Sequence, residues 1–228
     1  MIRFEDVSKA YLKGQSALQG VSFKIEPQEM VYLTGHSGAG KTTIMRLIAA
    51  QERVSLGNIY FDNKLITDIS KEKIPFLRRK IGMIFQDHHL MLNKTVAENI
   101  ALPLLIEGIS VSQINERIHE VIEKVGLKGK GNSYPLALST GEQQRVGIAR
   151  AIIGKPKLLL ADEPTGNLDR RLSLDILELF NELNDEGMTI IMATHDIDLI
   201  SHYPKRTIRL KSGNIICDGM FNPEDYDV

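Results

Sequence analysis

Residues 35–42 read Gly35-His36-Ser37-Gly38-Ala39-Gly40-Lys41-Thr42 and match G-x-x-x-x-G-K-[ST], the pattern of a phosphate-binding loop. Glycines let such a loop turn tightly, so that its backbone N–H groups converge on phosphate oxygens. The positive end of the following helix faces the same anion. In this pattern Lys41 reaches the β- and γ-phosphates of a nucleotide, and the Thr42 hydroxyl holds Mg²⁺.

The residues on either side of this loop predict an α/β fold. Residues 30–33 form a short apolar strand before it, and residues 43–50 form a helix with apolar residues on one face. Two later apolar strands, at 157–161 and 189–193, each follow a predicted helix. Strands that alternate with helices pair as a parallel sheet covered on both faces, and sites form at the carboxyl ends of its strands.

Two regions are expected to lie outside the parallel sheet. Alternating apolar residues predict antiparallel strands near the N-terminus, at residues 2–7 and 21–25. In the middle of the chain, apolar residues recur at helical spacing over residues 112–125, which predicts an amphipathic helix packed on neighbouring helices.

Residues 158–163 read Leu-Leu-Leu-Ala-Asp-Glu, an apolar strand that ends in two acids. Such a strand belongs inside a sheet, where two adjacent carboxylates are costly unless a cation or a reaction uses them. Downstream of a phosphate-binding loop, the pattern makes Asp162 a Mg²⁺ ligand, usually through water. Glu163 is then the general base that polarises the attacking water.

A third motif, Leu138-Ser139-Thr140-Gly141-Glu142-Gln143-Gln144, marks the start of a helix. Ser139 and Glu142 form an S-x-x-E capping box, in which each side chain accepts a backbone hydrogen bond. A helix N-terminus with Ser and Gly is also an anion site. Together with the loop around Lys41, this motif suggests one ATP molecule held from two sides.

Composition narrows the function classes. The 228 residues carry a net charge of −1, whereas a sequence-independent nucleic-acid binder is expected to be basic, so nucleic acid is not an expected partner. The one cysteine, Cys217, forms no internal disulfide and is expected to pack in a strand. No signal peptide is visible and no run approaches 18 apolar residues, so membrane association is expected through a partner.

The motifs together resemble the ABC (ATP-binding cassette) ATPase family over essentially the whole chain. Its signature motif is usually Leu-Ser-Gly-Gly-Gln, which the chain matches in Leu138, Ser139 and Gly141 but not in Thr140 and Glu142. Glu is common among relatives at the last position. Thr140 places a β-branched residue near the expected phosphate, and we expect it to weaken or slow closure without abolishing function.

The resemblance implies roles for further residues. Tyr11 matches the aromatic that stacks on adenine, Gln86 the glutamine that senses Mg²⁺ and the γ-phosphate, and His195 the switch histidine. Asn167-Leu168-Asp169 matches the loop that crosses the dimer interface. The expected catalytic residues are Glu163, His195 and Gln86, and the expected Mg²⁺ ligands are Thr42, Gln86 and Asp162. The expected ATP-binding residues are Tyr11, Gly35, His36, Ser37, Gly38, Ala39, Gly40, Lys41, Thr42, Thr43, Ser139, Gly141 and Asp169.

The same resemblance implies an α/β P-loop fold in one ATP-binding domain over residues 1–228. The ATP-binding core with its antiparallel part is expected at 1–86 and 155–228, and a helical subdomain that ends in the signature helix at 87–154. ATP bound to one copy would be closed over by Ser139 and Gly141 of the other, so that a homodimer forms around ATP. Hydrolysis of ATP to ADP and phosphate then reopens the dimer.

Several segments resemble the bacterial cell-division branch of this family, most distinctively Asp87-His88-His89 after the glutamine. ATPases of this branch work with FtsX, a four-helix integral membrane protein, and activate cell-wall hydrolases at the septum. The resemblance therefore implies a peripheral location on the cytoplasmic side of the inner membrane, with division-ring proteins as further partners. Two alternatives stay open: the ATPase subunit of a lipoprotein-releasing or macrolide-type transporter, and an ATP-dependent division scaffold with secondary hydrolysis.

Residues 87–93 are expected to act as a hinge between the core and the helical subdomain. Any rotation of that subdomain on ATP binding must pass through this segment, because Gln86 ends a strand that reaches the nucleotide. We expect a cytoplasmic helix of the membrane partner to dock in a groove beside it.

Overall fold

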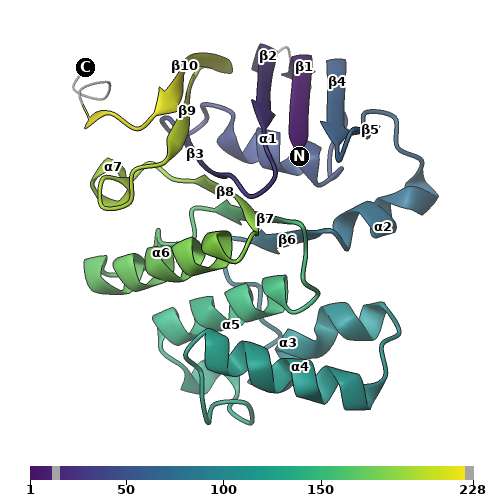
Figure 1. Cartoon of the computed structure of the whole chain (residues 1–228), viewed down its shortest axis with the longest axis vertical. Coiled ribbons are helices and arrows are strands. Elements are labelled where there is room, and N and C mark those ends of the chain that lie inside the picture. The colour runs from purple at the N-terminus through teal and green to yellow at the C-terminus, as the bar shows by residue number, and fades with distance from the viewer. Residues whose placement is uncertain (12–15, 224–228) are drawn as a thin grey trace.

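A computed structural model describes residues 1–11 and 16–223, which form two sheets and the helices around them (Figure 1). The larger sheet has six strands in the order β10-β9-β3-β8-β7-β6. Its strands are β3 (Met30–Thr34), β6 (Ile81–Ile84), β7 (Leu158–Asp162), β8 (Thr189–Ala193), β9 (Arg206–Lys211) and β10 (Asn214–Met220). All neighbours are parallel except β10, which runs antiparallel to β9. The predicted α/β fold with a mostly parallel sheet is confirmed.

A second, antiparallel sheet has the order β2-β1-β4-β5. It contains β1 (Ile2–Ala10), β2 (Ser16–Ile25), β4 (Leu56–Phe61) and β5 (Lys64–Leu65). Its apolar face includes Phe4 and Phe23, whose stacked rings lie 4.4 Å apart between centroids. Helix α1 (Lys41–Ile48) shares one buried core with strands of both sheets. The phosphate-binding loop is thus held between the two sheets.

Helices cover the other face of the parallel sheet and form a second core with it. Helix α6 (Arg170–Asp185) lies next to the sheet, and α3 (Val96–Ile106), α4 (Val111–Lys124) and α5 (Thr140–Ile152) form a layer at the far end from the antiparallel sheet (Figure 1). The shorter elements are η1 (Lys71–Lys73), α2 (Ile74–Arg78), η2 (Pro135–Ala137) and α7 (Ile197–Ile200). Within residues 1–11 and 16–223, no helix has the length and apolar character needed to cross a bilayer. The subdomain boundaries expected at 86/87 and 154/155 stay a prediction.

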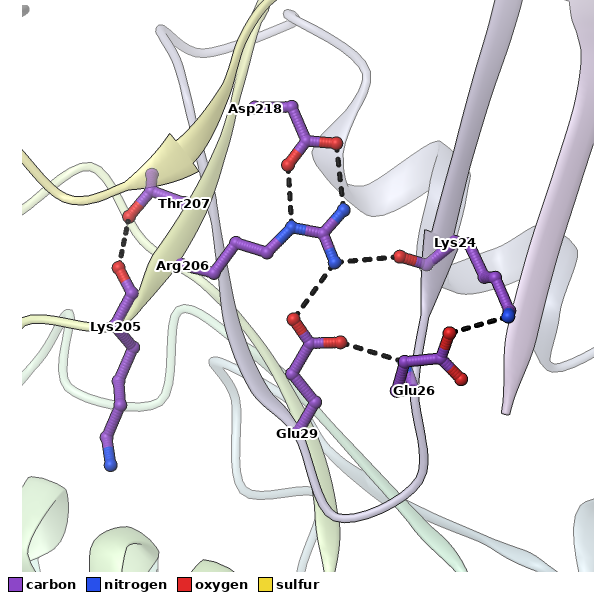
Figure 2. Close-up of polar contacts among 7 residues, drawn as sticks. All are labelled: Lys24, Glu26, Glu29, Lys205, Arg206, Thr207 and Asp218. Carbon is purple, nitrogen blue, oxygen red and sulfur yellow. Dashed lines mark hydrogen bonds and ion pairs between the residues drawn. The ribbon is translucent and has the colours of Figure 1, made fainter.

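One arginine joins the two sheets (Figure 2). Arg206 on β9 donates from Nε and Nη2 to the two carboxylate oxygens of Asp218 on β10, at 2.7 and 2.8 Å. Its Nη1 donates to the carbonyl of Lys24 on β2 and to Oε1 of Glu29 just before β3, at 2.8 and 2.9 Å. These partners raise the pKa of Arg206 above its usual range, so the cation is stabilised where the sheets meet.

We expect Arg206→Met to lower the free energy of unfolding by about 2 kcal/mol, because Asp218 and Glu29 would lose their shared cation in a partly buried site. Denaturant unfolding measures this change. Lys94→Met is the matched control, since the Lys94–Glu98 pair is exposed and should cost no more than about 0.5 kcal/mol. Equal losses for the two variants would show that Arg206 does not join the sheets energetically.

Candidate active site

The phosphate-binding loop runs from the end of β3 to the start of α1, as its sequence predicts. Gly35 has φ +136°, and a Cβ there would lie 2.3 Å from the carbonyl oxygen of Leu210. Gly40 has φ +115°, and a Cβ there would lie 2.8 Å from the carbonyl oxygen of Ala17. Both positions therefore require glycine, for backbone conformation and for close approach to neighbouring strands.

Lys41 is held inside the loop that it follows. Its ammonium donates to the carbonyl oxygens of Gly35 at 2.7 Å and His36 at 3.3 Å, and the side chain is only 6% exposed. Its Nζ also lies 3.6 Å from Oε1 of Glu163. The loop thus holds a nearly buried cation where a phosphate group would arrive.

The two acids at the end of β7 lie beside this cation. Glu163 has φ +49° and its backbone N–H donates to the carbonyl of Ala193 on β8. Its Oε2 is 2.6 Å from Nδ1 of His195, which follows β8. Because β7 and β8 are parallel neighbours, Glu163 and His195 meet at the same edge of the sheet and contact each other directly.

Asp162 is partly buried and faces the start of α1, where Thr42 lies. Burial raises the pKa of the Asp162 carboxyl above its usual range, while a hydrogen bond from the Thr42 side chain and the charge of Lys41 oppose that rise. Thr42 and Asp162 thus present two oxygen donors side by side, the kind of donor that Mg²⁺ prefers.

A cavity of about 800 Å³ opens in front of these groups. Besides the expected base, ten predicted site residues line it: Tyr11, Ser37, Gly38, Ala39, Gly40, Lys41, Thr42, Thr43, Gln86 and Asp162. Glu163, the expected base, lines it too. The phosphate-binding loop, the start of α1, the segment after β6 and the end of β7 therefore form part of the cavity wall.

Tyr11 lines the outer part of this cavity and is 37% exposed. Its hydroxyl lies 3.4 Å from Oγ1 of Thr43, and Nζ of Lys9 lies 5.0 Å from the centre of its ring. Gln86 enters the cavity from the segment after β6, with Nε2 only 3.4 Å from where a Cβ on Gly166 would be. Both side chains therefore line the cavity, and their roles toward a nucleotide stay a prediction.

The other predicted residues lie outside this cavity. Gly35 and His36 act through their carbonyls, which hold Lys41. Asp169 accepts a hydrogen bond from the N–H of Leu172 at 2.9 Å and so caps α6. His195 lines a smaller cavity of about 260 Å³, which shares Glu163 with the larger one.

The signature motif also lies apart from the cavity in this chain, at the start of α5. Ser139 and Glu142 form the predicted capping box, with the Glu142 carboxylate also 3.1 Å from Lys130. Gly141 packs so closely on α6 that a Cβ would lie 3.1 Å from Cδ1 of Leu172. Thr140 is the exposed first residue of α5 and has an ordinary helical backbone, so its position in the monomer requires no glycine.

Several wall residues carried no signal in the sequence. Ser16, Ala17 and Gln19 of β2 and Ser212 of the β9–β10 turn line the cavity, although none belongs to a recognisable motif. They reach it because β2 and the turn pack against the phosphate-binding loop, where the N–H of Gly213 donates to the carbonyl of Ala39. Only the fold brings them there.

Comparisons with known proteins agree with this geometry. Residues 18–166 match the family model described as ABC transporter. The chain is 56% identical to the cell division ATP-binding protein FtsE of Escherichia coli K12, over 94% of this chain and 97% of that one. It is 44% identical to the FtsE of Bacillus subtilis, over 96% of each chain.

Solved structures of ABC cassettes share the fold. The dimeric structure of MJ0796, a bacterial ABC transporter cassette, matches with a TM-score of 0.88 and 35% identity over 97% of this chain and 99% of that one. CbiO1 from Clostridium perfringens, part of the ABC transporter complex CbiONQ, matches with a TM-score of 0.90 and 32% identity over 99% and 89%. The chain therefore belongs to the ABC transporter family and is an ATPase of that family.

Proposed function

We propose that the chain binds Mg-ATP in the 800 Å³ cavity and hydrolyses it as one half of a dimer. The observation that supports this most is the separation of two anion-binding elements in one chain. The loop around Lys41 lines the cavity, whereas the capped N-terminus of α5 at Ser139 does not. A second copy would supply that N-terminus from the open side, which is how one ATP would be held from two sides.

Within the closed site, each of the predicted residues would have a separate role. Lys41 would neutralise charge on the β- and γ-phosphates, and Ser139 and Gly141 of the second copy would donate to the γ-phosphate. Glu163 would accept a proton from the attacking water, and His195, already in contact with it, would orient that water and the γ-phosphate. Tyr11 would stack on the base.

The residues present fit a magnesium ion. Thr42, Asp162 and Gln86 all line the cavity and offer oxygen donors, of which Asp162 brings a carboxylate. Bound there, Mg²⁺ would supply charge neutralisation on the transferred phosphoryl group. The partly buried carboxyl of Asp162 would bind the ion only when this carboxyl is deprotonated.

We further propose that the dimer drives a conformational change in an integral membrane partner of the FtsX type, at the inner face of the membrane and at the division septum. The sequence identity of the chain to FtsE proteins supports this role over that of a transporter ATPase. Activation of septal cell-wall hydrolases would be the outcome. Purification of the chain from detergent-solubilised membranes, with identification of the bound four-helix protein, tests the partner's identity.

An apolar groove offers the docking site for a cytoplasmic helix of that partner. It has a volume of about 530 Å³ and lies between α2, β6, α3 and α5, with Met83, Leu102 and Ile106 among its lining residues. Ile106 is 76% exposed, so most of its apolar side chain faces water in the isolated chain. The groove adjoins β6, the strand that leads to Gln86, so a helix bound there would sense movement of that strand.

We expect Ile106→Asp to reduce capture of the membrane partner at least about tenfold, because it places a charge in an apolar contact. ATP hydrolysis by the purified chain should be unchanged, since Ile106 does not line the nucleotide cavity. Val111→Asp is the control: Val111 is 67% exposed on the same helical layer and lies outside the groove. Equal capture by the Ile106 variant and the control would place the partner contact elsewhere.

A further inference from the structure

Arg150 connects two segments that both serve the proposed ATP site. It lies in the last turn of α5, the helix that begins at the signature motif. Its Nη1 donates to the carbonyl of His89 at 2.8 Å, and its Nη2 donates to the carbonyl of His88 at 2.7 Å. Both carbonyls belong to the loop that follows Gln86.

These two hydrogen bonds are well suited to transmit movement. The planar guanidinium binds two successive carbonyls at once, so it fixes the orientation of the loop as well as its distance from α5. The side chain is partly buried, and this burial lowers the pKa of the Arg150 guanidinium. Because a desolvated cation without acceptors is costly, the loop carbonyls and Arg150 should stay together when either segment moves.

The surroundings leave α5 able to act as a lever. Its C-terminal end rests directly on β6, where a Cβ on Gly82 would lie 2.5 Å from the carbonyl oxygen of Ala151. From Arg150 to Ser139 the helix extends about 16 Å, at 1.5 Å per residue. A small rotation about the contact at Gly82 would therefore displace Ser139 and Gly141 more than it displaces Arg150.

The rest of the loop is held by a different helix. The side chain of Asn99 on α3, which is fully buried, accepts from the N–H of Met91 and donates to the carbonyls of Met91 and Lys94. Between that site and Gln86, His89 adopts φ +45°. The hydrogen bonds of Arg150 thus lie on the part of the loop nearest the cavity.

We propose that Arg150 is a positioning residue that makes the loop after Gln86 and helix α5 move as one unit. Occupation of the cavity beside Gln86 would then set the position in which Ser139 and Gly141 are presented to a second copy. This inference rests on the proposed ATP-sandwich dimer and adds the element that links nucleotide binding to it. Arg150 does not line the nucleotide cavity, so it would act through these two segments and not on ATP directly.

The test places Arg150→Lys and Arg150→Met in the Glu163→Gln chain, in which bound ATP should persist. We expect ATP affinity to stay within about threefold, while the dimerisation constant with ATP weakens at least about tenfold, because a lysine keeps the charge but not the two-point geometry. With Glu163 intact, kcat should fall by a similar factor and KM should change little. Arg145→Lys is the matched control, since Arg145 lies on the same helix and donates to a carbonyl far from Gln86, that of Val125.

The outcomes separate this inference from the proposed function. If Glu163→Gln alone stays monomeric with ATP, the sandwich proposal fails. If it dimerises and both Arg150 variants dimerise equally well, the role of Arg150 is overturned.

If the Arg150 variants do not fold, the coupling is tested instead by hydrogen exchange on the Glu163→Gln chain. The measurement is made at protein concentrations where this chain is monomeric. Residues 86–91 and the first turn of α5 should change exchange rate at the same ATP concentration. A change confined to residues 86–91 would contradict the coupling.

Discussion

Replacing Lys41 with alanine is expected to abolish both ATP binding and hydrolysis. The ammonium is nearly buried and contacts two loop carbonyls and the Glu163 carboxylate. Among the described residues that line the cavity, Lys41 is the only cation. Without this ammonium, the negative charge of the triphosphate would lie beside the carboxylates of Glu163 and Asp162 with no cation to offset their repulsion. We expect ATP affinity to fall by roughly 100-fold or more, because a charge-assisted contact in a water-poor site is lost.

Isothermal titration with ATP and a phosphate-release assay measure these losses. Lys64→Ala serves as control, because Lys64 lies on β5 and does not line the nucleotide cavity. A melting temperature close to that of the unmodified chain would show that the Lys41 variant is folded. A folded Lys41→Ala chain with near-normal hydrolysis would rule out the assignment of the phosphate-binding loop.

Glu163→Gln should remove hydrolysis while leaving ATP bound. The amide keeps the shape of the carboxylate and its place between Lys41 and His195, but it does not accept a proton from water. We expect kcat to fall by roughly 10²-fold or more, the usual contribution of a general base. ATP affinity should stay within about threefold, since Lys41 and the loop remain intact.

Steady-state phosphate release and a nucleotide-binding titration separate these two effects. Glu182→Gln is the control, because Glu182 is an exposed acid of α6 remote from the cavity lining. Turnover by Glu163→Gln within about threefold of the unmodified chain would show that another group is the base.

Local patterns in the sequence were sufficient to predict those helices and strands that lie directly beside a motif. The strand before Gly35, the helix after the loop, the buried strand that ends at Asp162 and the capping box at Ser139 are all present, although the helix spans Lys41–Ile48 and not the expected 43–50. Each depends on neighbouring residues alone: glycine conformation, apolar runs or a cap. That is why these elements and the cavity wall they form could be predicted.

Other parts depend on contacts between distant residues. Strand β10 alternates between exposed and partly buried residues and has an apolar run of only three residues, 215–217, and β5 has two residues, so neither carried a clear signal. Arg150 had none because its partners are backbone carbonyls 61 and 62 positions away. The contact between Glu163 and His195 follows from the pairing of β7 with β8.

The effect of Thr140 stays a prediction, for a related reason. In the chain itself, Thr140 is simply the exposed first residue of α5. Any hindrance to closure would arise against the second copy, so neither the local sequence nor the fold of one chain determines it.

The mass of the Glu163→Gln chain in solution tests the central claim most directly. Light scattering after gel filtration should give twice the monomer mass with saturating ATP and the monomer mass with ADP. Ser139→Asp in the same chain should restore the monomer in ATP, because aspartate still caps α5 but repels the γ-phosphate of the other copy. Ser139→Thr, which keeps a hydroxyl cap, should still dimerise. A Glu163→Gln chain that binds ATP and remains monomeric would contradict the ATP-sandwich account.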